Sequence, residues 1–322
     1  MARLLATKPY NDVAPIFTVP PGQYKNLFLF FDGVSATSQT ALITDTGIVT
    51  ASKNGIPFIA SVKFENLQHI ANMRGGQVLF TSGSATTTRY LAPLMFWDAS
   101  APDNGLLVTE NDLVTIQIAL ATGWTTHVNT TGGSGTWFLY GDDSDCVQNY
   151  LPILTQFGYA SVTNLKDRLQ VQNVSRLFVD MAADSNLQKI QVIVDKKLLH
   201  DLTASAMLAI SNFNNQLEDA TQLATSHITN AMFAELPLAV NGRIGEYLND
   251  SVEIAVQATT ATSPNIITLG YMFTPDAQVQ SMAKVQQSAV DSLKKQPTAT
   301  AQVIRTLISK NQAHDALTAA GV

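Results

Sequence analysis

Asn111–Ile118 reads NDLVTIQI and Asn249–Val256 reads NDSVEIAV, so one segment led by Asn-Asp occurs twice, 138 residues apart (249 minus 111). In both copies apolar side chains occupy alternate positions, which predicts a β-strand with one buried face and one wetter face. Alternating strands also resemble one another by chance. The match therefore gains its weight from the segments that surround the two copies.

These surroundings recur in the same order. Each half has a Phe-containing strand that ends in Asp, then an alternating strand, a helix, the Asn-Asp strand and one last strand. The first three of these are Leu29–Asp32, Ala60–Phe64 and a helix from Asn66 in the first half, and Leu177–Asp180, Ile190–Val194 and a helix from Leu198 in the second. The shared order indicates an internal duplication.

Residues 9–140 have the sequence pattern of an all-β unit, in which short β-rich runs are separated by Pro, Gly and Ser/Thr clusters. We expect a strand over Leu27–Phe31 that ends in a turn at Asp32-Gly33. Asn54-Gly55 predicts another turn, before a strand over Phe58–Phe64. About eight short strands in roughly 130 residues is the density of a sandwich or a jelly roll.

The second half repeats this pattern after Cys146–Asp167, an irregular stretch that we interpret as a linker. Strands are expected over Arg176–Asp180, Ile190–Val194, Val252–Val256 and Asn265–Phe273, with a helix from about Leu198 to Leu223. From Asp276 to Val322 the apolar residues take helical spacing instead. The expected division is an N-terminal arm over 1–9, a first β domain over 10–160, a second over 161–275 and a helical C-terminal tail over 276–322.

Composition excludes several functional classes. The chain has 322 residues and a net charge of −6, and 14% of its residues are charged, well below the roughly 25% of a typical soluble domain. Such a chain is not built to coat nucleic acid, and a sparsely charged surface suits burial against partners. The N-terminal apolar stretch is shorter than a signal-peptide core, and the densest apolar run is far shorter than a membrane span of about 20 residues. We therefore expect a soluble body that is not exported by that route.

Signatures of catalysis are weak. Gly132–Gly135 lacks the Lys of a phosphate-binding loop, the five histidines have no ligand-like spacing, and Cys146 is expected to be a packed, inert thiol. Asp142–Asp145 offers oxygen ligands for Ca²⁺ but lacks the Gly and Glu of an EF-hand loop, which favours a solvated acidic turn. A carboxylate pair for glycoside chemistry stays open, because sequence does not show spacing in space. We expect no enzyme activity, no cofactor and no metal site.

Both ends of the chain are basic. The N-terminal arm carries two cations, and the tail carries five against three acids (5 − 3 = +2). One reading is that the ends pack on the domains or on neighbouring copies; the other is that they face an anionic surface such as lipid headgroups or nucleic acid. The candidate membrane-proximal or inter-subunit residues are Arg3, Lys8, Lys284, Lys294, Lys295, Arg305 and Lys310.

The order of elements resembles the double jelly-roll major capsid proteins of tailless icosahedral bacteriophages with an internal lipid membrane. The resemblance covers about residues 10–275 and is one of pattern, carried by Phe17–Gln23 before the first strand, Val62–Leu67 running into the helix, and Leu106–Leu120. It implies an all-β fold of two tandem eight-stranded jelly rolls, with short inserted helices and the helical tail. It also implies pseudo-hexagonal trimeric capsomers that tile a virion shell, with the termini near the membrane.

The partners implied are two further copies of the chain, neighbouring capsomers, other capsid proteins and the internal membrane, with no sequence-specific nucleic-acid binding. The implied location is the virion, after assembly in the host cytoplasm. Two alternatives stay open. One is a secreted two-jelly-roll enzyme or lectin that acts on glycans, although Trp97, Trp124 and Trp137 are too scattered to indicate a cleft. The other is a minor vertex protein of the same kind of virion.

Overall fold

The computed structural model describes residues 2–10, 12, 14–34, 47–73, 87–97, 101–120, 135–158, 168–172, 174–180, 187–194, 196–214, 233–238, 251–258 and 265–273. Met1–Met272 forms one compact unit and Phe273–Val322 a second, of which only Phe273 is described. The expected tail over 276–322 therefore lies outside the described residues. None of the helices in the described ranges is long and apolar enough to span a membrane.

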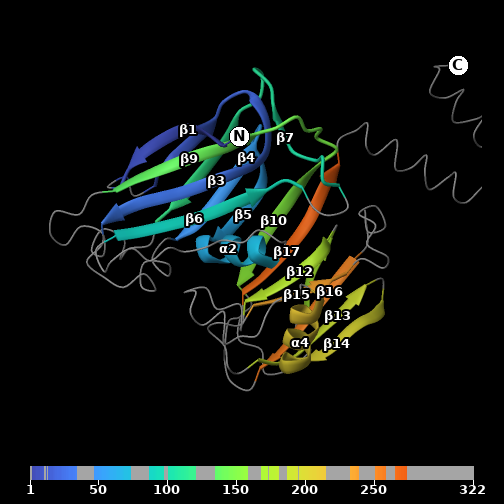
Figure 1. The fold of residues 1–322 in the computed structure, drawn as a ribbon. Coiled ribbons are helices and arrows are strands. Elements are labelled where there is room, and N and C mark those ends of the chain that lie inside the picture. The colour runs from blue at the N-terminus through green and yellow to red at the C-terminus, as the bar shows by residue number, and fades with distance from the viewer. Residues whose placement is uncertain are drawn as a thin grey trace, which may run out of the picture. The chain divides into compact units, whose positions relative to one another are not determined.

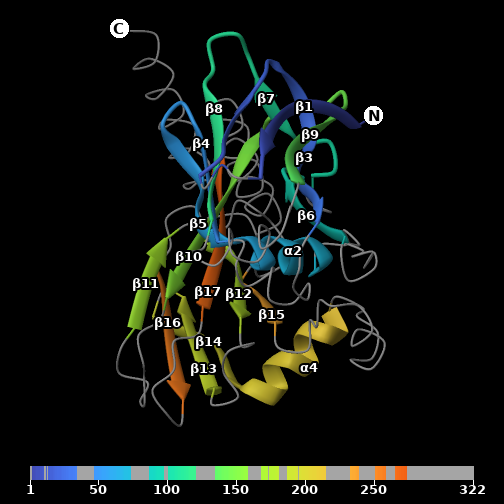
Figure 2. The same cartoon turned by 90° about the vertical axis from the view of Figure 1, so that its left-hand side faces the viewer.

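The first half of the chain forms two sets of strands (Figures 1 and 2). One sheet has the order β1-β9-β3-β6, with β7 also paired to β3; the other set has the order β2-β8-β4-β5. Helix α2 (Phe64–Met73) follows β5 directly. The strands are β1 (Ala2–Pro9), β2 (Ile16–Val19), β3 (Gly22–Val34), β4 (Ile48–Lys53), β5 (Ile56–Lys63), β6 (Thr87–Met95), β7 (Leu106–Val108), β8 (Val114–Ala119) and β9 (Gly135–Asp143).

The second half also forms two sets, in the orders β10-β17-β12-β15 and β11-β16-β13-β14. Helix α4 (Ala204–Asn214) follows β14 directly and contacts β15. The strands are β10 (Tyr150–Gly158), β11 (Arg168–Gln172), β12 (Val174–Asp180), β13 (Leu187–Val194), β14 (Lys197–Thr203), β15 (Phe233–Pro237), β16 (Ser251–Ala258) and β17 (Asn265–Phe273). Leu177, Ile190, Met207 and Ile254 belong to the apolar core of this half.

The two halves share one topology. With β7 set aside, the strands of each half can be numbered one to eight along the chain. In both halves they then pair in the orders 1-8-3-6 and 2-7-4-5, with a helix after the fifth strand. Two four-stranded sets connected in this way form a jelly roll. The chain is a double jelly roll, and the expected duplication is confirmed.

One short parallel ladder joins the two jelly rolls. Strands β5 and β10 pair with Leu154 opposite Ile59 and Thr155 opposite Ala60. This ladder makes a single eight-stranded sheet, β15-β12-β17-β10-β5-β4-β8-β2, from one set of each half. The free edge of β5 and the free edge of β10 therefore cover each other.

The side chain of Gln156, on β10, reinforces this joint. Its Oε1 accepts a hydrogen bond from the backbone N–H of Lys63 (2.9 Å) and another from Nδ2 of Asn66 (3.1 Å). Lys63 ends β5 and the fully buried Asn66 lies in the first turn of α2. One amide oxygen of the second roll thus satisfies two donors of the first, at the point where strand gives way to helix.

Two expectations from local sequence are confirmed. In β8 the side chains of Val114, Ile116 and Ile118 are fully buried and those between them are not, as strict alternation predicts. Asn54 and Gly55 form the turn between β4 and β5, with φ of 53° and 80°. Two consecutive residues with positive φ suit the tight hairpin for which Asn-Gly is the preferred pair.

The expected turn at Asp32-Gly33 is wrong. Strand β3 continues through Val34, with Asp32 opposite Arg89 of β6 and Thr136 of β9. A strand that is paired on both sides gains backbone hydrogen bonds from both neighbours, and this pairing overrides a local turn preference.

Two segments of the second half also differ from expectation. The predicted linker Cys146–Asp167 contains β10, the first strand of the second roll. Residues 198–203, predicted as helix, form β14, and the helix begins at Ala204. By topology the counterpart of β13 is therefore β4, not Ala60–Phe64, and the counterpart of β5 is β14. Leu198 and Leu199 are adjacent and both exposed, so β14 lacks the alternation that marks a half-buried strand.

A buried side chain, Asn104, ties the end of β6 to the start of β10. Its Nδ2 donates to the carbonyl oxygens of Phe96 (2.5 Å) and Tyr150 (3.1 Å). Its Oδ1 accepts from the backbone N–H groups of Asn149 (2.9 Å) and Tyr150 (3.2 Å). All four hydrogen-bonding positions of the amide are used, so no substitute reproduces the set.

We expect Asn104→Ala to lower the free energy of unfolding by about 3–4 kcal/mol, because it removes four hydrogen bonds to buried or half-buried backbone groups. Chemical denaturation at a fixed protein concentration measures this. Asn111→Ala, at an exposed turn, is the matched control and should change stability by less than about 0.5 kcal/mol. Equal effects of the two substitutions would contradict the role assigned to Asn104.

Candidate functional site

The cations expected at the N-terminus lie on a strand. Residues 1–9, expected as an arm, include β1, which pairs with β9 along its length. The side chain of Arg3 is exposed, and Lys8 is half-buried opposite Trp137. The other five candidates, Lys284, Lys294, Lys295, Arg305 and Lys310, lie outside the described residues.

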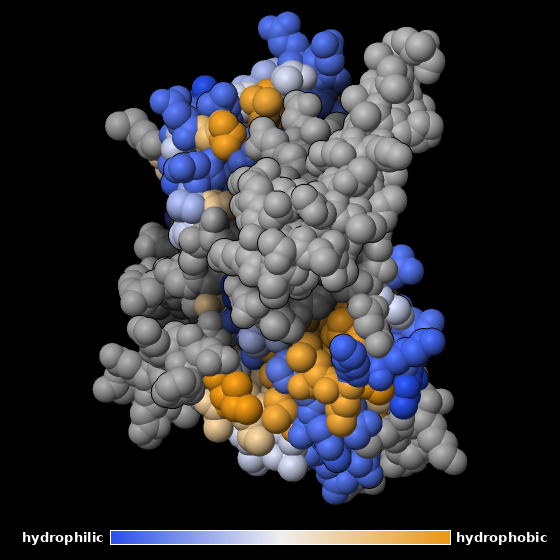
Figure 3. All heavy atoms as spheres, turned by 90° about the vertical axis from the view of Figure 1, so that its right-hand side faces the viewer, coloured by the Kyte–Doolittle hydropathy of each residue, from blue (hydrophilic) through white to orange (hydrophobic). Residues whose placement is uncertain are grey.

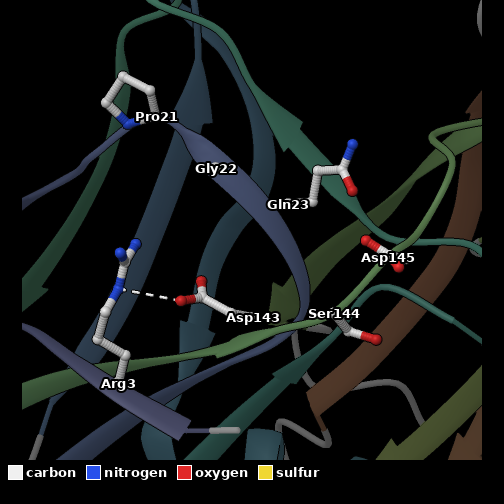
Figure 4. A pocket seen from close by; sticks show the side chains of 7 residues that line it. All are labelled: Arg3, Pro21, Gly22, Gln23, Asp143, Ser144 and Asp145. Carbon is white, nitrogen blue, oxygen red and sulfur yellow. Dashed lines mark ion pairs between the residues drawn. The ribbon is translucent and has the colours of Figure 1, made fainter.

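Arg3 binds the carboxylate of Asp143, as Figure 4 shows, and also the phenol of Tyr24. Its Nε lies 3.1 Å from Oδ2 of Asp143, at the end of β9, and its guanidinium donates to the hydroxyl of Tyr24 at 3.3 Å. The Tyr24 hydroxyl in turn donates to the carbonyl of Pro20 at 2.9 Å. Arg3 is therefore partly neutralised within its own subunit.

The side chain of Tyr24 fits against two glycines, where any larger residue would clash with it. A Cβ on Gly22 would lie 2.7 Å from the Tyr24 hydroxyl oxygen, and a Cβ on Gly141 would lie 2.6 Å from the ring. Burial raises the pKa of Tyr24, and the hydrogen bond and charge of Arg3 act in the opposite direction. The phenol is thus a fixed, neutral hydrogen-bonding group rather than a reactive one.

These residues border an open pocket of about 500 Å³ between the starts of β1 and β3 and the end of β9 (Figure 4). Its lining consists of Arg3, Pro21, Gly22, Gln23, Asp143, Ser144 and Asp145. The backbone N–H of Ser144 donates to the Gln23 carbonyl at 3.3 Å, which fixes the turn after β9 against β3. Two of the charged groups that line the pocket, Arg3 and Asp143, are thus paired with each other.

The acidic turn Asp142–Asp145 has partners of its own. Asp142 accepts a hydrogen bond from Asn26 at 3.4 Å, and Asp143 pairs with Arg3. Within the described ranges no three His, Cys, Asp or Glu residues gather in a way that could hold a metal ion. These two contacts link the acidic turn to β3 and β1.

The Asn-Asp segment singled out by its repetition forms a second polar cluster. Asp112 accepts hydrogen bonds from the backbone N–H and the hydroxyl of Thr109, both at 2.8 Å, and from Nδ2 of Asn54 at 2.6 Å. Asn54 also accepts from the backbone N–H of Leu113 at 2.8 Å. The tip of the β4–β5 hairpin is thereby fastened to the loop that precedes β8.

Lys53 extends this cluster toward β7. Its Nζ lies 3.5 Å from Oδ2 of Asp112 and donates to the carbonyl of Leu107 (2.5 Å) and to Gln148 (3.2 Å). The hydrogen bonds from Thr109, together with Asn54 and the charge of Lys53, hold the pKa of Asp112 well below its usual range. Sequence alone could not reveal this cluster, because its members come from three separate segments, at residues 53–54, 107–113 and 148.

The other residues that the sequence analysis considered for chemistry are buried or contact neighbouring residues of the fold. Cys146 is buried, and burial raises the pKa of its thiol. The ring of His69 stacks on Phe233 at 4.9 Å, and Nε2 of His200 lies 2.9 Å from the carbonyl of Pro237. Trp137 is fully buried, so its indole has no face for a sugar.

No family model matches the chain, and no curated protein matches it. Solved structures do match. The crystal structure of the STIV major capsid protein has a TM-score of 0.60 at 9% identity, over 86% of this chain and 98% of that chain. A chain of the atomic structure of Sulfolobus Turreted Icosahedral Virus has a TM-score of 0.59 at 10% identity, over 96% and 97%. PBCV-1 VP54, fitted into a reconstruction of the virophage Sputnik, has a TM-score of 0.51 at 10% identity, over 84% and 93%. These structures share the double jelly-roll fold.

Stability should depend on pH through Asp112. A carboxyl whose pKa is lowered by folding stabilises the protein above its unfolded pKa, about 3.9, and this stabilisation is lost as the pH falls toward the folded pKa. We expect Asp112→Asn to lower the melting temperature at pH 7 by roughly 2–4 °C, with a difference from wild type that shrinks below about pH 4.

Thermal melts of both proteins from pH 7 to pH 3 measure this difference. Glu110→Gln, an exposed carboxylate of the same loop, serves as the control. A difference for Asp112→Asn that stays constant over the whole range would rule out the charged cluster as its origin.

Proposed function

We propose that this chain is a major capsid protein, a structural subunit of an icosahedral viral shell. The observation that carries the proposal is the double jelly-roll fold itself. It matches a chain of Sulfolobus Turreted Icosahedral Virus over 96% of this chain and 97% of that one, so the likeness is not limited to one roll. The capsid role is inferred from the STIV major capsid protein, whose fold this chain shares, and from the properties of the chain's own surface.

The surface supports a role in protein contacts. Several of its charges pair within the subunit, among them Arg168 with Glu253 (2.5 Å) and Lys189 with Asp201 (2.7 Å). Large apolar side chains are exposed on or next to several strands, among them Leu4, Ile16, Ile56, Leu113 and Leu198. Paired charges and exposed apolar groups lower the desolvation cost of burying this surface against another subunit.

In this proposal three chains form one capsomer. Two similar rolls per chain give six similar units around a three-fold axis, which is the pseudo-hexagonal shape that tiles a shell. Neighbouring capsomers and other capsid proteins are then the lateral partners. We place the boundary between the rolls between β9 and β10, earlier than the residue 160 expected from sequence, because β10 is the first strand of the second roll by topology.

The virus we propose is a tailless bacteriophage with an internal membrane, assembled in the host cytoplasm. The basic residues of the tail, residues 276–322, support contact with anionic lipid, since each Lys or Arg near such a surface contributes about 1 kcal/mol. At the other end Arg3 is already paired with Asp143, which makes the tail the stronger candidate for lipid.

The capsomer proposal predicts a solution mass of three times 34.7 kDa, about 104 kDa, or larger assemblies built from that species. Size exclusion with light scattering over a range of concentrations measures it. A monomer that persists at the highest concentration would contradict the proposal. It would favour the glycan-active alternative, which activity on polysaccharides and glycopeptides would then test.

The lipid proposal predicts that Lys294→Gln with Lys295→Gln weakens binding to vesicles containing anionic lipid by about ten- to thirtyfold, since two basic residues are removed. Vesicle co-sedimentation measures the affinity. The matched control is Lys196→Gln with Lys197→Gln, an adjacent pair of exposed lysines at the turn into β14. Equal losses for the two pairs would mean that binding follows net charge and not the tail.

A further inference from the structure

Among the described strands, two edges lack the partner that their counterparts in the other roll have. In the first roll the fifth strand, β5, pairs on its outer side with β10, the first strand of the second roll. The counterpart of β5 in the second roll is β14, and the counterpart of β10 in the first roll is β1. Among the described strands β14 pairs only with β13, and β1 pairs only with β9.

Burial differs between the closed joint and these open edges. At the joint Ile59, Leu151 and Leu154 are 2%, 0% and 9% exposed. At the open edges Leu4 of β1 is 49% exposed, and Leu198 of β14 is 55% exposed. Leu199, also on β14, is 36% exposed. Native proteins protect open strand edges with charge, proline or coverage, so edges that present leucines indicate that something covers them.

The second roll exposes apolar residues on two elements that contact each other. Leu198 and Leu199 are on β14, and Ile210 is on α4, which contacts β14. Figure 3 shows apolar side chains gathered in its lower part, where the elements of the second roll lie, whereas those in its upper part stand singly among hydrophilic ones. Beside the two leucines of β14, the second roll thus exposes further apolar side chains.

We propose that β1 of one subunit pairs in parallel with β14 of the next, and so repeats between chains the joint that β10 and β5 make within the chain. This inference rests on the proposed function, in which copies of the chain assemble, and it names the strands that meet. The pairing adds a strand to an open sheet edge, with backbone hydrogen bonds as its source of affinity.

The internal joint also predicts the register. Helix α2 begins directly after Lys63 and α4 directly after Thr203, an offset of 140 residues (203 minus 63) that makes Leu199 the counterpart of Ile59. The hydroxyl of Thr268, on β17, donates to the carbonyl of Thr155 at 3.4 Å. When β17 and β9 are aligned at their last residues, Phe273 and Asp143, Thr268 corresponds to Phe138, which pairs with Thr7.

Thr7 is thus the counterpart of Thr155, and Ala6 is the counterpart of Leu154. Because Leu154 lies opposite Ile59 in the internal joint, we expect Ala6 of one subunit opposite Leu199 of the next.

The contact is head-to-tail, because it joins two different surfaces of identical chains. Such a heterologous contact generates a ring where its rotation closes and a filament where it does not. A ring of three chains has three β1–β14 joints and three β10–β5 joints alternating around it. Every roll then meets both of its neighbours through the same kind of ladder.

The test is cross-linking of engineered cysteines with a short bis-maleimide. The double variant Ala6→Cys with Leu199→Cys should convert most of the chain to covalent trimer. A mixture of the two single variants, co-assembled, should give covalent dimer only, because each chain then carries one of the two reactive positions. The control is Ile16→Cys with Leu199→Cys, since Ile16 lies on another edge strand, β2, and is more exposed than the half-buried Ala6. Native Cys146 is buried and wild-type protein gives the background.

The outcomes separate this inference from the proposed function. A species of trimer mass whose Ala6/Leu199 double variant cross-links no more than the Ile16/Leu199 control would overturn the β1–β14 pairing and leave the capsomer proposal standing. A chain that is monomeric at every concentration would overturn both. Where the double variant does not fold, the neighbouring pair Thr7→Cys with His200→Cys makes the same test, with the same two results deciding it.

Discussion

The parallel ladder between β5 and β10 is the interaction on which the rest of this structure depends. A jelly roll made of two four-stranded sets has open edges, and each open edge presents unpaired backbone groups that must find partners or water. Pairing one edge of the first roll with one edge of the second removes two of these edges at once. It also makes one sheet continuous through both rolls, so the two rolls are not independent domains joined only by a linker.

Side chains stabilise this joint because the ladder itself is short, with two residue pairs in register. Gln156 accepts hydrogen bonds from the end of β5 and the start of α2. Asn104 accepts hydrogen bonds from the backbone at the start of β10. Both side chains are amides, which donate and accept hydrogen bonds. They can therefore pair with backbone N–H and C=O groups that have no partner in a neighbouring strand. The buried Asn104 and the half-buried Gln156 therefore favour one arrangement, since any other leaves hydrogen bonds unmade.

Sequence predicted the elements whose signal is local. Alternation identified β8 and β16, and Asn54-Gly55 identified its hairpin, because burial on one face and positive φ are properties of a few consecutive residues. The sequence analysis predicted helix in place of β14, because the exposed Leu198 and Leu199 break the alternation. It also predicted a linker where β10 lies.

The candidate site shows the same limit. Arg3 was visible as a cation, but its partner Asp143 lies 140 residues away in sequence (143 minus 3), and only strand pairing brings the two together.

The pairing of β1 with β9, and of β17 with β10, has a consequence for the order of synthesis. The first strand of each roll pairs with the last, so neither roll can close until its final strand, ending at Asp143 or at Phe273, has left the ribosome. Until then β1 has no ladder on either side, and its apolar residues are open to any strand nearby. Contacts that span so much sequence form slowly. During translation, the closing of each roll on itself therefore competes with pairing to another copy of the chain.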